Sequence, residues 1–157
     1  MGTKAREIVE LDVNELISEL NRAYADEWLA FYQYWLTAQV AQGRESKMVA
    51  QELKRVAMEE LEHAEELAAR IIQLGGKPLV NPKEWFTKTN CAYKEPPKDP
   101  KDVTQMIKDT VEAERCAISI YNKLAARTHG KDHTTYHLAR HILAEELEHE
   151  DTFENLL

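Results

Sequence analysis

The pentapeptide Glu-Glu-Leu-Glu-His occurs twice in this chain, at residues 59–63 and again at residues 145–149. Both copies lie in segments rich in Ala, Leu, Glu, Lys and Arg, which favour helix. Side chains three positions apart share a face of a helix. The second Glu and the His of each copy therefore point the same way: Glu60 with His63, and Glu146 with His149. The repeat predicts two helices that each present one carboxylate and one imidazole to a common centre.

Four long helices are expected, because apolar residues recur at helical spacing between segments that end helices, such as Gly75-Gly76 and His129-Gly130. The predicted helices span about 13–42, 45–74, 102–128 and 132–156, within a single domain covering residues 1–157. A long Pro-containing connection separates the second from the third, and Glu84–Phe86 is expected to form a short extra helix in it. This connectivity predicts an all-α, ferritin-like antiparallel four-helix bundle with a long crossover between helices 2 and 3.

Two further glutamates lie on apolar stripes. Glu27 is in the middle of the stripe on the first predicted helix, and Glu114 has the matching position on the third. A buried carboxylate is costly unless it is paired or bound to a metal. With the two Glu-x-x-His pairs, these residues complete the ligand arrangement described for di-iron carboxylate bundles. The other acidic residues of the repeats are expected to point sideways or outward: Glu59, Glu62, Glu145 and Glu148.

Four carboxylates and two imidazoles suit two divalent ions, and such an oxygen-rich set fits Fe(II) or Mn(II) better than Cu(I). Glu60 and Glu146 are expected to bridge the two metals. The remaining ligands divide between them, Glu27 with His63 and Glu114 with His149. Tyr34 and Tyr121 lie two turns along the same faces, where they either hydrogen-bond the carboxylates or pack in the core.

The formal net charge of −8 gives DNA binding no electrostatic basis. No apolar run is long enough to span a membrane, and residues 1–12 contain no apolar signal core. We therefore expect a soluble, cytoplasmic protein without a membrane partner. Two cysteines, without CxxC spacing, are too few for a disulfide scaffold.

The segment Glu27–Tyr34, EWLAFYQY, resembles the first-helix motif of bacterioferritins in the ferritin superfamily, and the resemblance covers nearly the whole chain. It implies that the six residues above are di-iron ligands, with two Fe ions per chain and Mn or Zn as substitutes in a preparation. Leu61 occupies the position of the haem-ligating Met of bacterioferritins, so no haem is expected. The short tail after His149 is expected to lack the fifth helix of 24-subunit ferritins.

The pair Cys91 and Cys116, the latter within Glu114-Arg115-Cys116-Ala117, resembles the Dps-like proteins called thioferritins. The resemblance implies a ferroxidase that oxidises Fe(II) with hydrogen peroxide or dioxygen. It further implies a 12-subunit cage that stores ferric mineral and protects against oxidative stress, here without the basic tail of DNA-binding Dps proteins. It also implies a Cys91–Cys116 disulfide, although disulfides are uncommon in the cytosol, so two free thiols remain the alternative.

Other functions stay open at this point. A small-molecule di-iron enzyme, such as a rubrerythrin-like peroxidase or an oxygenase, uses similar ligands. A manganese catalase and a non-catalytic structural bundle are further alternatives. The sequence decides neither the oxidant, the native metal, the subunit number nor the route of iron. His137 and His141 are expected at solvated or interface positions, and a role of His141 in iron uptake stays open because it lies near His149 on the helix.

Overall fold

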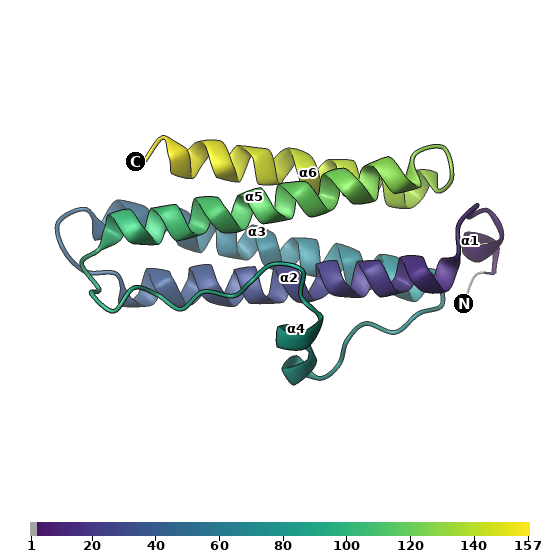
Figure 1. Ribbon diagram of the computed structural model, residues 1–157, viewed down its shortest axis with the longest axis horizontal. Coiled ribbons are helices and arrows are strands. Elements are labelled where there is room, and N and C mark those ends of the chain that lie inside the picture. Colours follow the sequence, from purple (N-terminus) through teal and green to yellow (C-terminus); the bar gives the residue numbers. More distant parts are fainter. Residues whose placement is uncertain (1–2) are drawn as a thin grey trace.

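The computed structural model describes residues 3–157, and within them it contains six α-helices. Four are long and two are short: α1 (Lys4–Glu7), α2 (Val13–Val40), α3 (Ser46–Gln73), α4 (Pro82–Lys88), α5 (Val103–Thr128) and α6 (His133–Glu154). Figure 1 shows two hairpins of long helices, α2 with α3 and α5 with α6, joined by a crossover that carries α4. The predicted all-α four-helix bundle with a crossover between its second and third long helices is confirmed.

Three of the four long helices, α2, α5 and α6, begin at capping aspartates, and α2, α3 and α5 end near glycines. Asp12 accepts hydrogen bonds from the backbone N–H groups of Asn14 (2.8 Å) and Glu15 (3.0 Å), and aspartates cap α5 and α6 in the same way. The turns after α2 and α3 contain Gly43 and Gly75, whose φ angles of 100° and 77° favour glycine. The extra helix α4 is longer than the predicted Glu84–Phe86, and α1 was not predicted.

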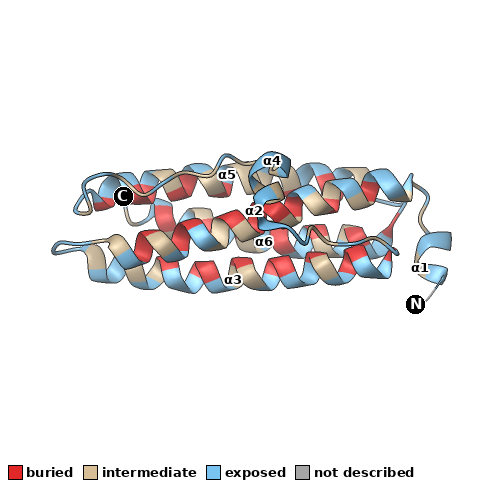
Figure 2. Ribbon diagram, turned by 90° about the horizontal axis from the view of Figure 1, so that it is seen from below, coloured by how far each residue is buried: buried red, intermediate tan, exposed pale blue. Residues whose placement is uncertain are grey.

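A belt of polar residues separates two apolar clusters of the core. Figure 2 shows the buried residues distributed along the long helices. One cluster includes Leu16, Leu20, Leu67, Ile71, Leu74, Leu124 and Ile142. The other includes Ala38, Val49, Leu53, Val56, Ile107, Val111 and Phe153. The buried glutamates and histidines of the repeats occupy the belt, so apolar packing on both sides holds their helices in place.

A buried ion pair joins the two hairpins at one end of the bundle. Arg70, in the last turn of α3, donates to both carboxylate oxygens of Asp132 at 2.8 and 2.9 Å and to Thr135 Oγ1 at 2.8 Å. Asp132 also caps α6, and both charged residues are buried. This contact fixes α3 against the start of α6, the two helices that carry the repeated pentapeptide.

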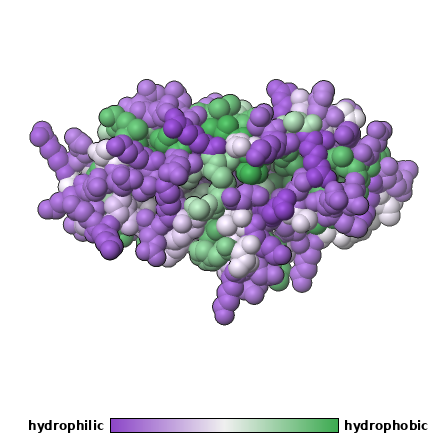
Figure 3. Space-filling model, in the orientation of Figure 1, coloured by the Kyte–Doolittle hydropathy of each residue, from purple (hydrophilic) through white to green (hydrophobic). Residues whose placement is uncertain are grey.

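Hydrophilic side chains cover most of the face seen in Figure 3, with smaller apolar patches between them. Across residues 3–157, none of the helices combines the length and the apolar character that a membrane span requires.

Candidate metal centre

The six residues predicted as metal ligands converge in the polar belt. Each side chain is at most 2% exposed, and they come from all four long helices: Glu27 (α2), Glu60 and His63 (α3), Glu114 (α5), and Glu146 and His149 (α6). They form two groups whose ligand atoms all lie within 4.8 Å of one another. Glu27 and His63 belong to one group and Glu114 and His149 to the other, whereas Glu60 and Glu146 belong to both.

Both imidazoles turn their Nδ1 atoms toward the carboxylates. His63 Nδ1 lies 3.0 Å from Glu60 Oε2, 3.3 Å from Glu146 Oε1 and 3.9 Å from Glu27 Oε2. His149 Nδ1 lies 3.4 Å from Glu60 Oε1, 3.7 Å from Glu114 Oε2 and 4.0 Å from Glu146 Oε2. The repeat of the sequence therefore appears in space as two similar halves that share Glu60 and Glu146.

Burial sets the protonation of this centre. It raises the pKa of Glu27 to about 8, and it raises the pKa of Glu114 and of Glu146, the latter also because of the charge on Glu60. Burial would also raise the pKa of Glu60, but the nearby imidazoles of His149 and His63 outweigh it and lower that pKa to about 2. The protons of the centre therefore concentrate on three of its carboxyl groups and on the imidazoles.

The histidines hold their protons firmly. Burial would lower the pKa of His149, yet the nearby carboxylates of Glu114 and Glu60 outweigh burial and raise it to about 10. The pKa of His63 is raised in the same way by Glu146, Glu27 and Glu60. A metal that binds Nδ1 must displace these protons.

The residues present fit a pair of cations. Among the described residues, six buried polar atoms of the centre have no hydrogen-bond partner: Glu60 Oε1, both oxygens of Glu114, both oxygens of Glu146, and His149 Nδ1. A buried polar atom without a partner costs about 1–3 kcal/mol, and more where it is charged. Divalent ions would satisfy these atoms and cancel about four negative charges with an oxygen-rich donor set of the kind that suits Fe(II) or Mn(II).

The two tyrosines expected beside the carboxylates are both buried next to them. The Tyr121 hydroxyl donates a hydrogen bond to Glu27 Oε1, so a residue of α5 orients a carboxylate of α2. Tyr34 is 1% exposed, and burial together with the charge on Glu114 raises its pKa well above the usual value. Each tyrosine thus lies near the glutamate of the opposite hairpin rather than the one on its own helix.

Two acidic residues that were expected to point away from the centre in fact contact it. Glu145 Oε2 lies 2.7 Å from His63 Nε2, and Glu59 Oε2 lies 2.8 Å from His149 Nε2. The first Glu of each pentapeptide therefore holds the imidazole of the other copy. A carboxylate on Nε2 orients the ring so that Nδ1 faces the centre. The helix wheel gave the direction of Glu59 and Glu145 relative to the axes of their own helices. It could not show that a neighbouring helix lies within reach of each side chain.

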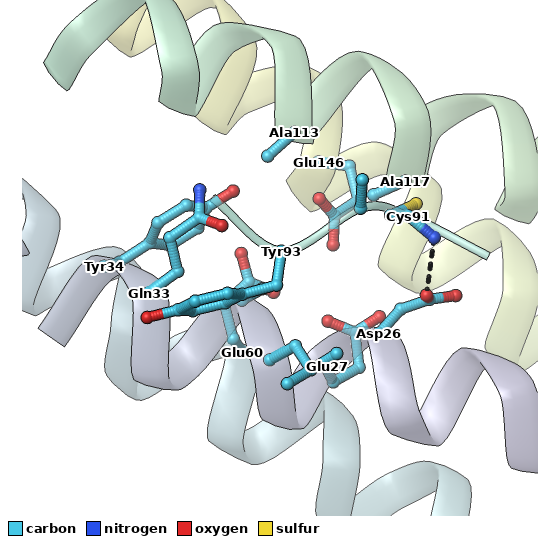
Figure 4. A pocket seen from close by; sticks show the side chains of 13 residues that line it. Asp26, Glu27, Gln33, Tyr34, Glu60, Cys91, Tyr93, Ala113, Ala117 and Glu146 are labelled. Atoms are coloured by element: carbon cyan, nitrogen blue, oxygen red, sulfur yellow. Dashed lines mark hydrogen bonds between the residues drawn. The ribbon is translucent and has the colours of Figure 1, made fainter. Parts of the chain in front are cut away.

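The crossover covers the centre on the side of α2 and α5 (Figure 4). Asp26, next to Glu27, accepts hydrogen bonds from Asn90 N (2.7 Å), Asn90 Nδ2 (2.6 Å) and Cys91 N (2.9 Å). Cys91 forms a disulfide with Cys116 of α5. A cavity of about 30 Å³, room for about one water molecule, lies between residues 91–93 of the crossover and the side chains of Glu27, Glu60 and Glu146. Asp26 is buried, and no feature of the sequence distinguished it from the acidic residues at the surface.

Comparison with known proteins assigns this arrangement to a family. The profile of the ferritin-like domain family matches residues 17–157, which include all six residues of the centre. The chain is 36% identical over 155 residues to the DNA protection during starvation protein of Pyrococcus furiosus, covering 97% of this chain and 83% of that protein.

Solved structures agree. A dodecameric thioferritin, the bacterioferritin-related protein from Bacteroides fragilis, superposes with a TM-score of 0.93 at 42% identity, covering 98% of this chain and 92% of that one. Dps from Thermosynechococcus elongatus superposes with a TM-score of 0.84 at 17% identity, covering 91% and 90% of the two chains, which shows the shared fold.

Proposed function

Because this chain belongs to the ferritin-like domain family, we propose that it oxidises Fe(II) at the six-residue centre and stores the ferric product in a hollow assembly of twelve chains. The observation that carries this proposal is the pair of overlapping ligand groups that share Glu60 and Glu146. Two ions held in this way would be bridged by these two carboxylates. Glu27 with His63 and Glu114 with His149 would complete the two sets.

Iron supplies the redox chemistry: each of two Fe(II) ions gives one electron to hydrogen peroxide, which takes up two protons and becomes two water molecules. Dioxygen is the alternative oxidant. The side chains provide position and protons. Tyr121 holds Glu27 through its hydroxyl, and Glu59 and Glu145 hold the two imidazoles. Protons displaced from His63 and His149 when Fe(II) binds are released next to the place where the oxidant needs them.

The crossover segment at residues 90–93 lies over the centre and limits the size of the molecules that can reach the ions. Asp26 and the disulfide fix residues 90 and 91 over the carboxylates, and the remaining cavity of about 30 Å³ leaves room for a small molecule only. A larger organic substrate does not fit there, which favours the small oxidant of a ferroxidase over the substrate of an oxygenase. Protection against oxidative damage then follows, because Fe(II) and peroxide are consumed together.

The proposed oligomeric state is based on similar proteins. A structure similar to this chain at 42% identity is described as dodecameric, and twelve copies of this 18.1 kDa chain would form a particle of roughly 200 kDa. The relative from Pyrococcus furiosus is named for protecting DNA. For this chain we propose protection by removal of iron and peroxide rather than by contact with DNA, because its net charge of −8 repels phosphates.

An iron-loading experiment tests the proposal. Fe(II) in large excess is added to the protein with limiting peroxide, and the iron that elutes with protein in size-exclusion chromatography is counted. We expect many iron atoms per chain in a particle of roughly 200 kDa. Only about two per chain on a monomer or dimer would indicate a small-molecule di-iron enzyme instead.

A pair of double variants provides the control. Glu60→Gln with Glu146→Gln removes the two shared carboxylates and should abolish rapid oxidation. Glu62→Gln with Glu148→Gln removes the same charge from exposed positions two residues further along each repeat and should leave it unchanged. Equal rates for the two double variants would show that the centre is not the site of oxidation.

A further inference from the structure

Two carboxylates separate the centre from solvent on the side formed by α3 and α6. Glu59 and Glu145 each place one oxygen on a buried imidazole, and their side chains are 35% and 40% exposed. They have equivalent positions in the two copies of the pentapeptide. An ion that approaches the centre from this side meets one of these two carboxylates first.

The surroundings of the two carboxylates differ sharply. Arg55, four residues before Glu59, places Nη1 2.7 Å from both oxygens of Glu59. The equivalent residue of the second copy, four before Glu145, is His141. Its Nε2 lies 3.8 Å from Glu145 Oε1 and 3.7 Å from Glu66 Oε1. Within residues 3–157, the ion pairs of Glu145 and Glu66 involve histidines and neither Lys nor Arg. The Glu59 side is therefore closed by a permanent cation, and the Glu145 side is not.

On the Glu145 side, His141 Nε2 has the spacing to share a cation with the carboxylate of Glu66 or with that of Glu145. Histidine binds divalent metals through a neutral ring nitrogen, whereas the guanidinium of Arg repels them. Two donor atoms that each lie about 2.1 Å from one ion are separated by about 3–4.2 Å, and both distances from His141 Nε2 fall in this range. They are too long for a hydrogen bond. A surface cavity of about 340 Å³, whose lining includes Glu66, Arg70, His137 and His141, gives a hydrated ion access to Glu66 and His141.

We infer that Glu66, His141 and Glu145 form a loading site for divalent iron, and that iron enters the centre on this side rather than past Glu59. The inference rests on the proposed function for its cargo. Glu145 is suited to the transfer, because one of its oxygens faces His141 while the other contacts His63 of the centre. The site breaks the near two-fold symmetry of the repeat at two positions: His141 corresponds to Arg55 of the first copy, and Glu66 corresponds to Thr152 of the second.

A metal titration without iron chemistry tests the site. The Glu60→Gln, Glu146→Gln double variant lacks the shared carboxylates of the centre, and Co(II) binding to it is followed by visible absorption and calorimetry. We expect about one weak site per chain, lost when His141→Arg is added because the new side chain copies the Arg55 arrangement. His133→Arg, an equal charge change at an exposed position of α6, should leave the site intact.

Kinetics supply the second readout. In the otherwise unchanged protein, His141→Arg should slow the initial oxidation of limiting Fe(II) by about tenfold, while the centre still binds two Co(II) ions per chain. A double variant that binds no Co(II), or a His141→Arg protein with the original rate and the original weak site, would overturn the inference. Failure of the unmodified protein to bind two ions per chain would count against the proposed function, and the titration of the weak site would still be informative.

Discussion

Glu27→Gln distinguishes a metal centre from a structural network of ion pairs. The substitution removes a charge from a side chain that is 2% exposed, and it keeps an oxygen that can accept the hydrogen bond of Tyr121. Burial raises the pKa of Glu27 in the folded protein to about 8, from 4.5 in a solvated chain. A carboxyl group in this position favours the folded state below pH 4.5 and loses that contribution as the pH rises toward 8.

The size of the stability difference follows from the two pKa values of Glu27. At pH 7 the carboxyl is still mostly protonated in the folded state and ionised in the unfolded state. The difference of about 2.5 pH units above the unfolded pKa corresponds to about 3 kcal/mol of lost stability. The metal-free Glu27→Gln protein should therefore be more stable than the unmodified protein by up to about 3 kcal/mol at pH 7, and equal to it at about pH 4.

Added metal should make the unmodified protein more stable than the Glu27→Gln variant. An ion at one hundred times its dissociation constant stabilises the folded state by about 2.7 kcal/mol, and the variant lacks one ligand for it. The assay is urea unfolding followed by circular dichroism at one protein concentration, with chelator or with Co(II), at pH 4 and pH 7. Glu62→Gln, an exposed change in α3, serves as control and should alter neither curve. A metal-free variant that is less stable than the unmodified protein, and that gains as much from Co(II), would refute the reasoning.

Three further outcomes are expected. Arg70→Ala should lower the unfolding free energy by about 3–5 kcal/mol in urea unfolding, since it leaves the buried Asp132 carboxylate unpaired, and adding Asp132→Asn should recover part of this loss. Cys91→Ser should lower stability by about 3 kcal/mol, as expected for a cross-link between residues 25 apart, and should speed proteolysis of the crossover. Co(II) should bind the centre more tightly from pH 6 to pH 8, with proton release measurable by calorimetry in two buffers, because the pKa of Glu27 is raised to about 8 and that of His149 to about 10.

The sequence was sufficient for the four long helices and for the six converging residues, because both depend on local periodicity. A helix of fixed pitch places Glu60 and His63 on one face whatever surrounds them. A glutamate in the middle of an apolar stripe must face the core, as Glu27 and Glu114 do.

The contacts between the hairpins could not be predicted in this way. The wheel of one helix gives the direction of Glu145 but not the position of His63 on another helix, so the pairing of each pentapeptide with the other was missed. The contacts of Asp26 depend on where the crossover passes, and a long loop has no periodicity from which to read that path. The partners of Tyr121 and Arg70 depend in the same way on how α3, α5 and α6 pack.

In each pentapeptide the first Glu contacts the His of the other copy. This arrangement also explains why a near-symmetric centre can admit iron from one side. Each half supplies the carboxylate that orients the histidine of the other half, so both copies of the pentapeptide must keep their Glu and His residues for either metal position to form. The residues one turn before them are under no such requirement. Arg55 and His141 can therefore differ without disturbing the ligands, and the difference decides which carboxylate an incoming cation can reach. Symmetry is needed where the ions are held, and asymmetry is tolerated at the surface where they arrive.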